Sequence, residues 1–203
     1  MIAIIDYGVG NLFSLKSSLA MIGAQAVVSG DADVIRTADR IILPGVGAFG
    51  DARKKLADSG MDSVLLSEAA KGKPVMGICL GMQMLFDKSF EYGEHAGLGL
   101  IPGEVVPMAD RLPEGLKVPH IGWNALDMQK PEHPLMKYTK SGDCVYFVHS
   151  FYATGCAAHT LATSEYGIDV TAAVARDNVM GCQFHPEKSG TVGLNILRAF
   201  CEL

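Results

Sequence analysis

Hydrophobic residues in the first half of the chain form short continuous runs, separated by segments with a helical spacing. An apolar run of about four residues is typical of a strand that is buried on both faces of a sheet. Apolar residues that recur every three or four positions are typical of a helix with one buried face. The predicted strands are Ile2–Ile5, Ala26–Ser29, Arg40–Leu43 and residues 74–78, and the predicted helices are residues 12–22, 48–57, 61–70 and 80–86.

The first predicted helix has signals at both ends and along one face. Asn11 follows a glycine-punctuated turn and can cap the helix, and Gly23 is expected to end it. The expected buried stripe consists of Leu12, Leu15, Leu19 and Ile22.

The second half of the chain has a different pattern between about residues 98 and 175. Short β-rich runs with turn residues between them, such as residues 103–106, 145–148 and 171–174, predict β-hairpins at the edge of the sheet. Residues 178–184 predict one more strand. The segment Gly190–Cys201 predicts a closing helix with an inward face. The residues expected on that face are Val192, Ile196, Leu197 and Phe200.

Alternation of strands and helices predicts an α/β fold with right-handed crossovers. We expect a three-layer structure in which a mostly parallel central sheet is flanked by helices, with antiparallel hairpins added in the second half. The 203 residues are expected to form a single domain, 1–203, because no linker or internal repeat interrupts the pattern.

Composition excludes several classes of protein. Hydrophobic residues make up 49% and charged residues 19%, as in an ordinary globular protein. The net charge is −5 and no run of Lys and Arg occurs, so nucleic-acid binding is not expected. No apolar stretch reaches the roughly 18 residues that a membrane-spanning helix needs. Residues 1–6 lack a basic start and predict a first strand rather than a signal peptide.

The cysteines fit a reducing compartment. They are odd in number and include no CxxC pair, so neither a disulfide framework nor a zinc site is indicated. We therefore expect a cytoplasmic protein with no metal ion and no cofactor, in which one reactive cysteine is possible. The five cysteines are Cys79, Cys144, Cys156, Cys182 and Cys201.

A possible nucleophile lies between a predicted strand and a predicted helix, in residues 77–81, with the sequence GICLG. Such glycines allow a tight turn that presents the side chain of Cys79 in a strained conformation, as in a nucleophile elbow. A helix start behind Cys79 favours the thiolate, and the N–H of Leu80 can donate to an oxyanion. The same pattern also fits a buried cysteine between two packing glycines.

A possible base and its orienting group follow the last predicted strand. A cysteine nucleophile needs a nearby base, and that base needs a partner that orients it. His185 comes just after a strand end, where α/β sheets bind ligands, and Glu187 can accept its ring proton. Alone, these residues would fit a surface turn. Together with Cys79 they favour a nucleophile, base and carboxylate.

Other polar positions are less decisive. The turn Gly45, Val46 and Gly47 follows the third strand and can supply a second oxyanion donor, or be an ordinary turn. From the residues alone, Gln83 fits a solvated helix position and His149 a structural role. Trp123 fits either a core or an interface, and Cys182 fits buried packing.

Six segments, taken in order, resemble the class I (triad) glutamine amidotransferases. Within that group the chain is similar to the glutaminase subunits of imidazole glycerol phosphate synthase, from histidine biosynthesis. The resemblance covers essentially the whole chain, with one conservative departure, Phe151 where tyrosine is frequent. The segments are residues 5–11 (IDYGVGN), 44–49 (PGVGAF), 77–83 (GICLGMQ), 120–124 (HIGWN), 147–151 (FVHSF) and 185–189 (HPEKS).

The resemblance implies a role for each matching residue. Cys79, His185 and Glu187 match the catalytic triad, and the turn Gly45, Val46 and Gly47 with the Leu80 amide matches the oxyanion site. The positions that match substrate-binding residues are Gln83, Glu91, His149, Ser150 and Phe151. The positions that match the partner-facing surface are Asn11, Trp123, Tyr146 and Lys188.

The resemblance also implies a partner. Glutamine would be hydrolysed here, and the ammonia would pass through a channel to a cyclase subunit, a (β/α)₈ barrel, in a heterodimer. A partner is expected from the residues too, because the glutaminase fold uses the whole chain and leaves no synthase domain. Three alternatives stay open at this stage: a small cysteine peptidase, a non-catalytic binding module, and the glutaminase of another pathway.

Overall fold

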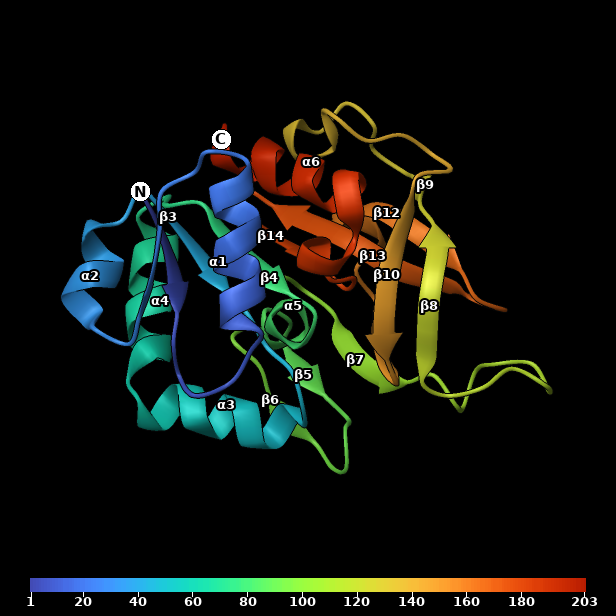
Figure 1. Cartoon of the computed structure of the whole chain (residues 1–203). Coiled ribbons are helices and arrows are strands. Elements are labelled where there is room, and N and C mark those ends of the chain that lie inside the picture. The colour runs from blue at the N-terminus through green and yellow to red at the C-terminus, as the bar shows by residue number, and fades with distance from the viewer.

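The computed structural model describes residues 1–203 and contains a central eight-stranded sheet with two smaller sheets beside it (Figure 1). The central strands are β1 Ile2–Ile5, β2 Ala26–Ser29, β3 Arg40–Leu43, β4 Val75–Ile78, β9 Asp127–Met128, β12 Thr160–Glu165, β13 Asp169–Arg176 and β14 Val179–Cys182. Their order is β2-β1-β3-β4-β14-β13-β12-β9. The first five strands of this order are parallel neighbours, and the last three continue the sheet in antiparallel fashion.

Helices cover both faces of the central sheet. One face carries α1 (Leu12–Met21) and α6 (Gly190–Cys201), and the other carries α2 (Ala32–Thr37), α3 (Phe49–Asp58) and α4 (Met61–Ala70). Successive side chains of a strand point to opposite faces. Ile4 therefore packs under α1 and α6, whereas Ile5 packs under α2 to α4. The short helix α5 (Leu80–Met84) follows β4.

Two smaller sheets lie beside the central one. The first has four strands in the order β11-β7-β5-β6, and the second is a ribbon of β8 and β10. Their bounds are β5 Lys88–Ser89, β6 His95–Ala96, β7 Glu104–Pro107, β8 His120–Ala125, β10 Cys144–His149 and β11 Phe151–Thr154. Single 3₁₀ turns occupy Pro134–Met136, Ala157–His159 and Pro186–Lys188.

Most predicted elements are confirmed. The first three strands have the predicted bounds, and α6 is also as predicted. Of its expected inward face, Ile196, Leu197 and Phe200 are fully buried and Val192 is partly buried. Gly23 follows the end of α1 with a positive φ of 77°, which glycine adopts without strain. The α/β class with a mostly parallel half and added antiparallel strands is therefore confirmed.

The placement of the hairpins is the main correction. Only β12, β13 and β9 extend the central sheet, whereas residues 103–106 and 145–148 belong to the two smaller sheets. The burial pattern explains the difference. Each residue of β4 is buried, but β10 alternates between buried and more exposed positions. A strand with one apolar face packs against the core as a ribbon and leaves its other face open.

Three local predictions also differ from the structure. Asn11 stands at the N-cap of α1, but its side chain accepts no capping hydrogen bond. Helix α5 ends at Met84 because Leu85 and Phe86 donate to the carbonyls of Met82 and Gln83 in tighter turns. Helix α2 was not predicted from the hydrophobic pattern, and its signal in the sequence is Asp31. This N-cap side chain accepts hydrogen bonds from the next turn.

Candidate active site

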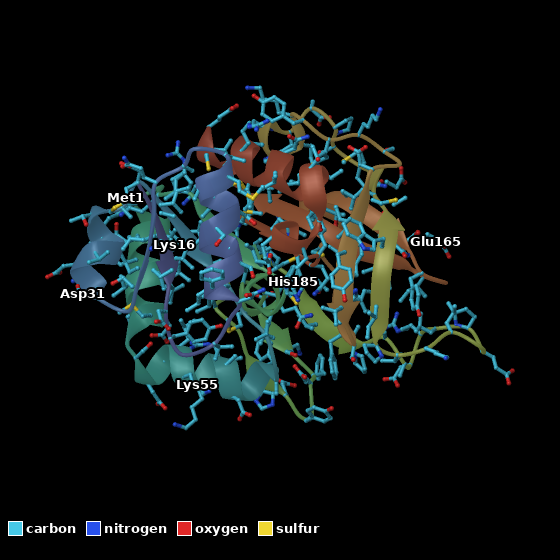
Figure 2. All side chains as sticks on the ribbon, viewed as in Figure 1. Met1, Lys16, Asp31, Lys55, Glu165 and His185 are labelled. Atoms are coloured by element: carbon cyan, nitrogen blue, oxygen red, sulfur yellow. The ribbon has the colours of Figure 1, made fainter.

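Three neighbouring strands bring the candidate residues to one edge of the sheet. Strands β3, β4 and β14 are adjacent and parallel, so their carboxyl ends meet. Residues 44–47 follow β3, Cys79 follows β4 directly, and His185 follows β14. Ligands bind at the carboxyl ends of parallel strands in open α/β sheets. Figure 2 shows His185 near the middle of the molecule, where its turn contacts α1 and β10.

The backbone at Cys79 is strained. Its φ is 54° and its ψ is −113°, backbone angles that residues other than glycine rarely adopt. Such conformations cost about 1–3 kcal/mol and occur mainly at functional sites. The side chain is 7% exposed and lies at the N-cap of α5, so the N–H of Leu80 has no partner within the helix. The predicted elbow therefore has the expected geometry.

Two glycines allow the turn after β3 to contact the elbow. A Cβ on Gly81 would lie 1.9 Å from the carbonyl oxygen of Leu43, and one on Gly45 would lie 2.7 Å from the amide nitrogen of Gly81. Backbone therefore packs on backbone here. Any larger residue would push residues 44–47 away from Cys79.

The turn itself presents free amide groups. Neither Val46 nor Gly47 donates a backbone hydrogen bond, and both line the same cavity as Cys79 and Leu80. The start of the turn is held by Tyr7, whose buried hydroxyl donates to the Pro44 carbonyl over 2.7 Å. Gly45 does not line the cavity and instead packs closely against the backbone of Gly81.

His185 and Glu187 form a buried pair. Nδ1 of His185 lies 2.9 Å from Oε1 of Glu187, with side chains that are 3% and 4% exposed. Burial lowers the pKa of His185, but the nearby Cys79 sulfur and Glu187 carboxylate favour the imidazolium more strongly and raise the pKa to about 9. Ser189 fixes this turn, because its hydroxyl donates to the His185 carbonyl and accepts the Tyr146 N–H. A thiol, an imidazole and a carboxylate in this order can act as nucleophile, base and orienting group.

One cavity collects most of the predicted site residues. Its volume is about 320 Å³, which suits a small ligand. Of the candidate catalytic, oxyanion and substrate positions, only Gly45 and Glu187 do not line it. Those that do are Val46, Gly47, Cys79, Leu80, Gln83, Glu91, His149, Ser150, Phe151 and His185.

Gln83 is buried, at 4% exposure, so its interpretation as a solvated helix residue is wrong. Its Nε2 donates to the Phe151 carbonyl over 3.0 Å and to Oε1 of Gln183 over 2.9 Å. Nε2 of Gln183 in turn lies 3.7 Å from Sγ of Cys79. Gln183 was missed at the sequence level. Its signal is a polar residue among buried positions, two residues before His185.

Glu91 presents a carboxylate to the cavity. The N–H of Phe49 donates to it over 2.8 Å. Burial raises the pKa of Glu91, although this hydrogen bond opposes the change. A cationic group of a ligand would therefore find a partly desolvated acceptor here.

His149, which lines the cavity, forms a second buried pair with His120. Nδ1 of His149 lies 2.9 Å from the Phe151 carbonyl, which only accepts, so Nδ1 carries the proton. Nε2 of His149 must then accept from Nδ1 of His120, at 3.0 Å. The ring of His120 is stacked between Phe147 and Tyr166. His149 is thus buried beside the cavity, and its missed partner is His120.

The four predicted partner-facing residues lie outside the main cavity. Trp123 is 53% exposed and meets Tyr146 edge-on, with ring centroids 6.1 Å apart. Nζ of Lys188 lies 5.8 Å from the Tyr146 centroid. Asn11 borders a void of about 10 Å³ together with His185 and Glu187. The four residues therefore lie in or beside the turn that carries His185.

Comparisons with known proteins identify the family. The model of the family Glutamine amidotransferase class-I matches residues 3–202. The chain is 48% identical to the Imidazole glycerol phosphate synthase subunit HisH of Wolinella succinogenes, covering all of both proteins. It is 50% identical to the protein of the same name from Caldanaerobacter subterraneus subsp. tengcongensis, with 100% of this chain and 98% of that protein covered. The chain belongs to the class-I glutamine amidotransferases and, within them, to the HisH family.

The fold agrees with this membership. A solved structure described as a glutamine amidotransferase superposes with a TM-score of 0.77 over 100% of this chain and 98% of that one, at 20% identity. The activity is accordingly that of the glutamine amidotransferase subunit of imidazole glycerol phosphate synthase, in histidine biosynthesis. The alternatives of a small peptidase, a binding module and a glutaminase of another pathway are set aside.

Three further observations concern the chain outside this cavity. No helix combines the length and the apolar character that crossing a membrane requires. No set of three or more His, Cys, Asp or Glu side chains lies together in an arrangement that could hold a metal ion. Cys182 is fully buried and its thiol points to the Phe184 carbonyl, as its interpretation as a packing residue predicted.

Proposed function

We propose that this HisH-family chain hydrolyses glutamine through a triad of Cys79, His185 and Glu187, and passes the ammonia to a (β/α)₈-barrel cyclase subunit in a cytoplasmic heterodimer. The observation that carries the proposal is the buried contact of 2.9 Å between His185 and Glu187, at the cavity that Cys79 lines. The cyclase would make imidazole glycerol phosphate and an aminoimidazole carboxamide ribonucleotide from that ammonia.

The first chemical step forms a thioester. The thiolate of Cys79 attacks the side-chain carbonyl carbon of glutamine, and the carbonyl oxygen gains the negative charge. Free N–H groups of Val46, Gly47 and Leu80 border the cavity and are the proposed donors to this oxygen. His185 gives its proton to the amide nitrogen, the C–N bond breaks, and ammonia leaves.

The second step regenerates the enzyme. His185 takes a proton from a water molecule, and the resulting hydroxide attacks the thioester carbonyl. The C–S bond breaks, glutamate is released, and Cys79 returns to the thiolate. Glu187 keeps Nδ1 of His185 protonated, so that Nε2 is the atom that exchanges protons in both steps.

Substrate recognition is assigned to polar groups that line the same cavity as Cys79. Glu91 and the amide oxygen of Gln83 are acceptors suited to the α-ammonium group of glutamine. The backbone of residues 149–151 borders the cavity and would lie beside the α-carboxylate. These groups recognise an amino acid end and leave the amide end near Cys79.

The proposed docking surface for the cyclase is the group of Asn11, Trp123, Tyr146 and Lys188. Tryptophan and tyrosine side chains are enriched at the centres of protein interfaces. Their position around the His185 turn gives a short route for ammonia, which would become unreactive ammonium in bulk water. The neighbouring Ile121, 57% exposed, adds apolar area to the same ribbon.

The turn of residues 45–47 could allow the partner to control glutaminase activity by changing the orientation of its peptide groups. Gly47 has a φ of 90° and lies in an exposed segment, so its peptide groups can take two orientations at low cost. A glutaminase that worked without its partner would waste glutamine. We therefore propose that activity is low in the isolated chain and rises strongly with the cyclase and its ribonucleotide ligand.

Glutamate release from glutamine tests the proposal. It is measured for the purified chain alone, with the histidine-pathway cyclase, and with the cyclase plus its ribonucleotide ligand. Stimulation of at least tenfold in the last mixture supports the triad and the partner control. Full activity of the chain alone would overturn the proposed control, and no release in any mixture would overturn the triad.

A further inference from the structure

The amide of Gln83 has only one free hydrogen-bonding atom. An amide nitrogen carries two protons, and both are used, by the Phe151 carbonyl and by Oε1 of Gln183. Oε1 of Gln83 has no partner in the chain and stays accessible in the cavity that Gln83 lines. The side chain therefore presents an acceptor, and no donor, to a ligand.

The orientation of Gln183 follows from that of Gln83. Because Nε2 of Gln83 donates, the atom of Gln183 that faces it must be the oxygen. Nε2 of Gln183 is then the atom that faces Sγ of Cys79, at 3.7 Å. The reverse orientation would set two N–H donors against each other and a carbonyl oxygen against the sulfur, which costs the energy of buried unpaired groups.

The hydrogen bonds that link Cys79, Gln183 and Gln83 end at the Phe151 backbone carbonyl, which can only accept. The Phe151 carbonyl cannot donate, and it also receives the N–H of His149 over 2.9 Å. Gln183 is 0% exposed, and its own N–H is bonded to the Ala172 carbonyl over 2.9 Å. Neither amide group can therefore reverse its orientation without breaking hydrogen bonds in the interior.

We propose that Gln183 is a positioning residue of the glutaminase reaction: its single amide directs an N–H at the sulfur of Cys79 and, through its oxygen, holds Gln83 with its acceptor toward the substrate ammonium group. This inference rests on the proposed function of Cys79. One neutral side chain thus links the nucleophile to the recognition of the amino acid end, without placing a second charge beside the thiolate.

Gln183→Glu and Gln183→Met separate the two contacts. The glutamate keeps an oxygen for Gln83 but replaces the donor to Cys79 with a second oxygen. The methionine has a similar volume and removes both contacts without adding charge. Gln25→Glu is the matched control, because Gln25 is exposed and its side chain forms no hydrogen bond.

The measurements are alkylation of Cys79 by iodoacetamide at pH 7 and steady-state glutamine hydrolysis in the complex with cyclase and ligand. Gln183→Glu is expected to slow alkylation and lower kcat at least tenfold, with KM changed less than threefold. Gln183→Met is expected to lower kcat similarly and also to raise KM at least threefold, because Gln83 is then free to turn.

Circular dichroism and thermal unfolding establish that each variant is folded, and either folded variant is sufficient for the test. A folded variant with alkylation rate and kcat within twofold of the wild type would overturn the proposal. A KM effect without a kcat effect would overturn the contact to Cys79. Failure of the proposed function itself would be seen separately, as a wild-type complex that releases no glutamate.

Discussion

Nδ1 of His185 lies 2.9 Å from Oε1 of Glu187, and both side chains are almost fully buried. Because the carboxylate and Cys79 favour the imidazolium more strongly than burial disfavours it, the pKa of His185 is about 9. The protonated form that gives a proton to the leaving ammonia is thus present below this pH and is lost as the pH rises through it.

Replacing Glu187 should lower the pKa of His185 and, with it, the pH above which activity is lost. In Glu187→Gln the charge that favours the imidazolium is absent, so the alkaline limb of kcat/KM for glutamine should move to lower pH and kcat should fall at least tenfold. The profile is measured from pH 6 to 10 in the complex with cyclase. Glu114→Gln, at an exposed loop position, should leave the profile unchanged. An alkaline limb that stays in place in Glu187→Gln would contradict the assignment.

His149 should make stability sensitive to acid. Burial lowers the pKa of His149 to about 3, so the folded state holds fewer protons than the unfolded state between about pH 3 and the ordinary value near 6.5. Its contribution to the free energy of unfolding is therefore complete above about pH 6.5 and decreases as the pH falls. The loss between pH 7 and pH 5 should be about 2 kcal/mol.

Denaturant unfolding at these two pH values measures this effect. His149→Gln has no group that titrates at this position and should lose about 2 kcal/mol less than the wild type over the same interval. An equal loss in both proteins would show that the acid sensitivity arises elsewhere, as at His120, whose pKa is also lowered by burial.

Cys79→Ala should separate the two reactions of the complex. The alanine removes the nucleophile, so glutamine-dependent synthesis should fall at least a thousandfold, whereas synthesis from added ammonium salt should stay within twofold. Product formation from each nitrogen source is measured with the same cyclase preparation. Glutamine-dependent turnover that survives the substitution would exclude Cys79 as the nucleophile.

Gly81→Ala tests the backbone packing at the elbow. The new Cβ would lie 1.9 Å from the Leu43 carbonyl oxygen, so the turns after β3 and β4 must separate. We expect a loss of stability of at least about 2 kcal/mol in denaturant unfolding, together with lost glutaminase activity. Gly115→Ala adds a Cβ in open space at a residue whose φ is already 97°. Backbone strain is then the only cost, and it should lower the stability by about 1 kcal/mol. Equal effects of the two substitutions would contradict the packing argument.

Trp123→Ala tests the proposed docking surface. Removing an exposed aromatic side chain from the centre of an interface typically costs 2 kcal/mol or more, so Kd for the cyclase should rise at least tenfold. Calorimetric titration measures it. The control is Met21→Ala, because Met21 is 74% exposed but lies at the far end of α1. A Kd that is unchanged by Trp123→Ala, or changed equally by both, would place the interface elsewhere.

Local patterns in the sequence predicted the parts of the fold that depend on neighbouring residues. Apolar runs such as Ile2–Ile5 predicted the buried strands because a strand covered on both faces has no polar positions to contain. The glycines around Cys79, and the placement of His185 after a strand, predicted where the site would form. Strand ends of a parallel sheet share an edge whatever the intervening sequence is.

Only the tertiary structure decided the contacts between distant segments. Gln183 meets Cys79, 104 residues away, and His120 meets His149 across two antiparallel strands. Neither pair has a local signature, because each forms only when separate elements are packed. The ribbon of β8 and β10 and the sheet of β5, β6, β7 and β11 were likewise decided by packing. Alternating apolar and polar residues predict that one face of a strand is buried, but they do not predict which other element packs against that face.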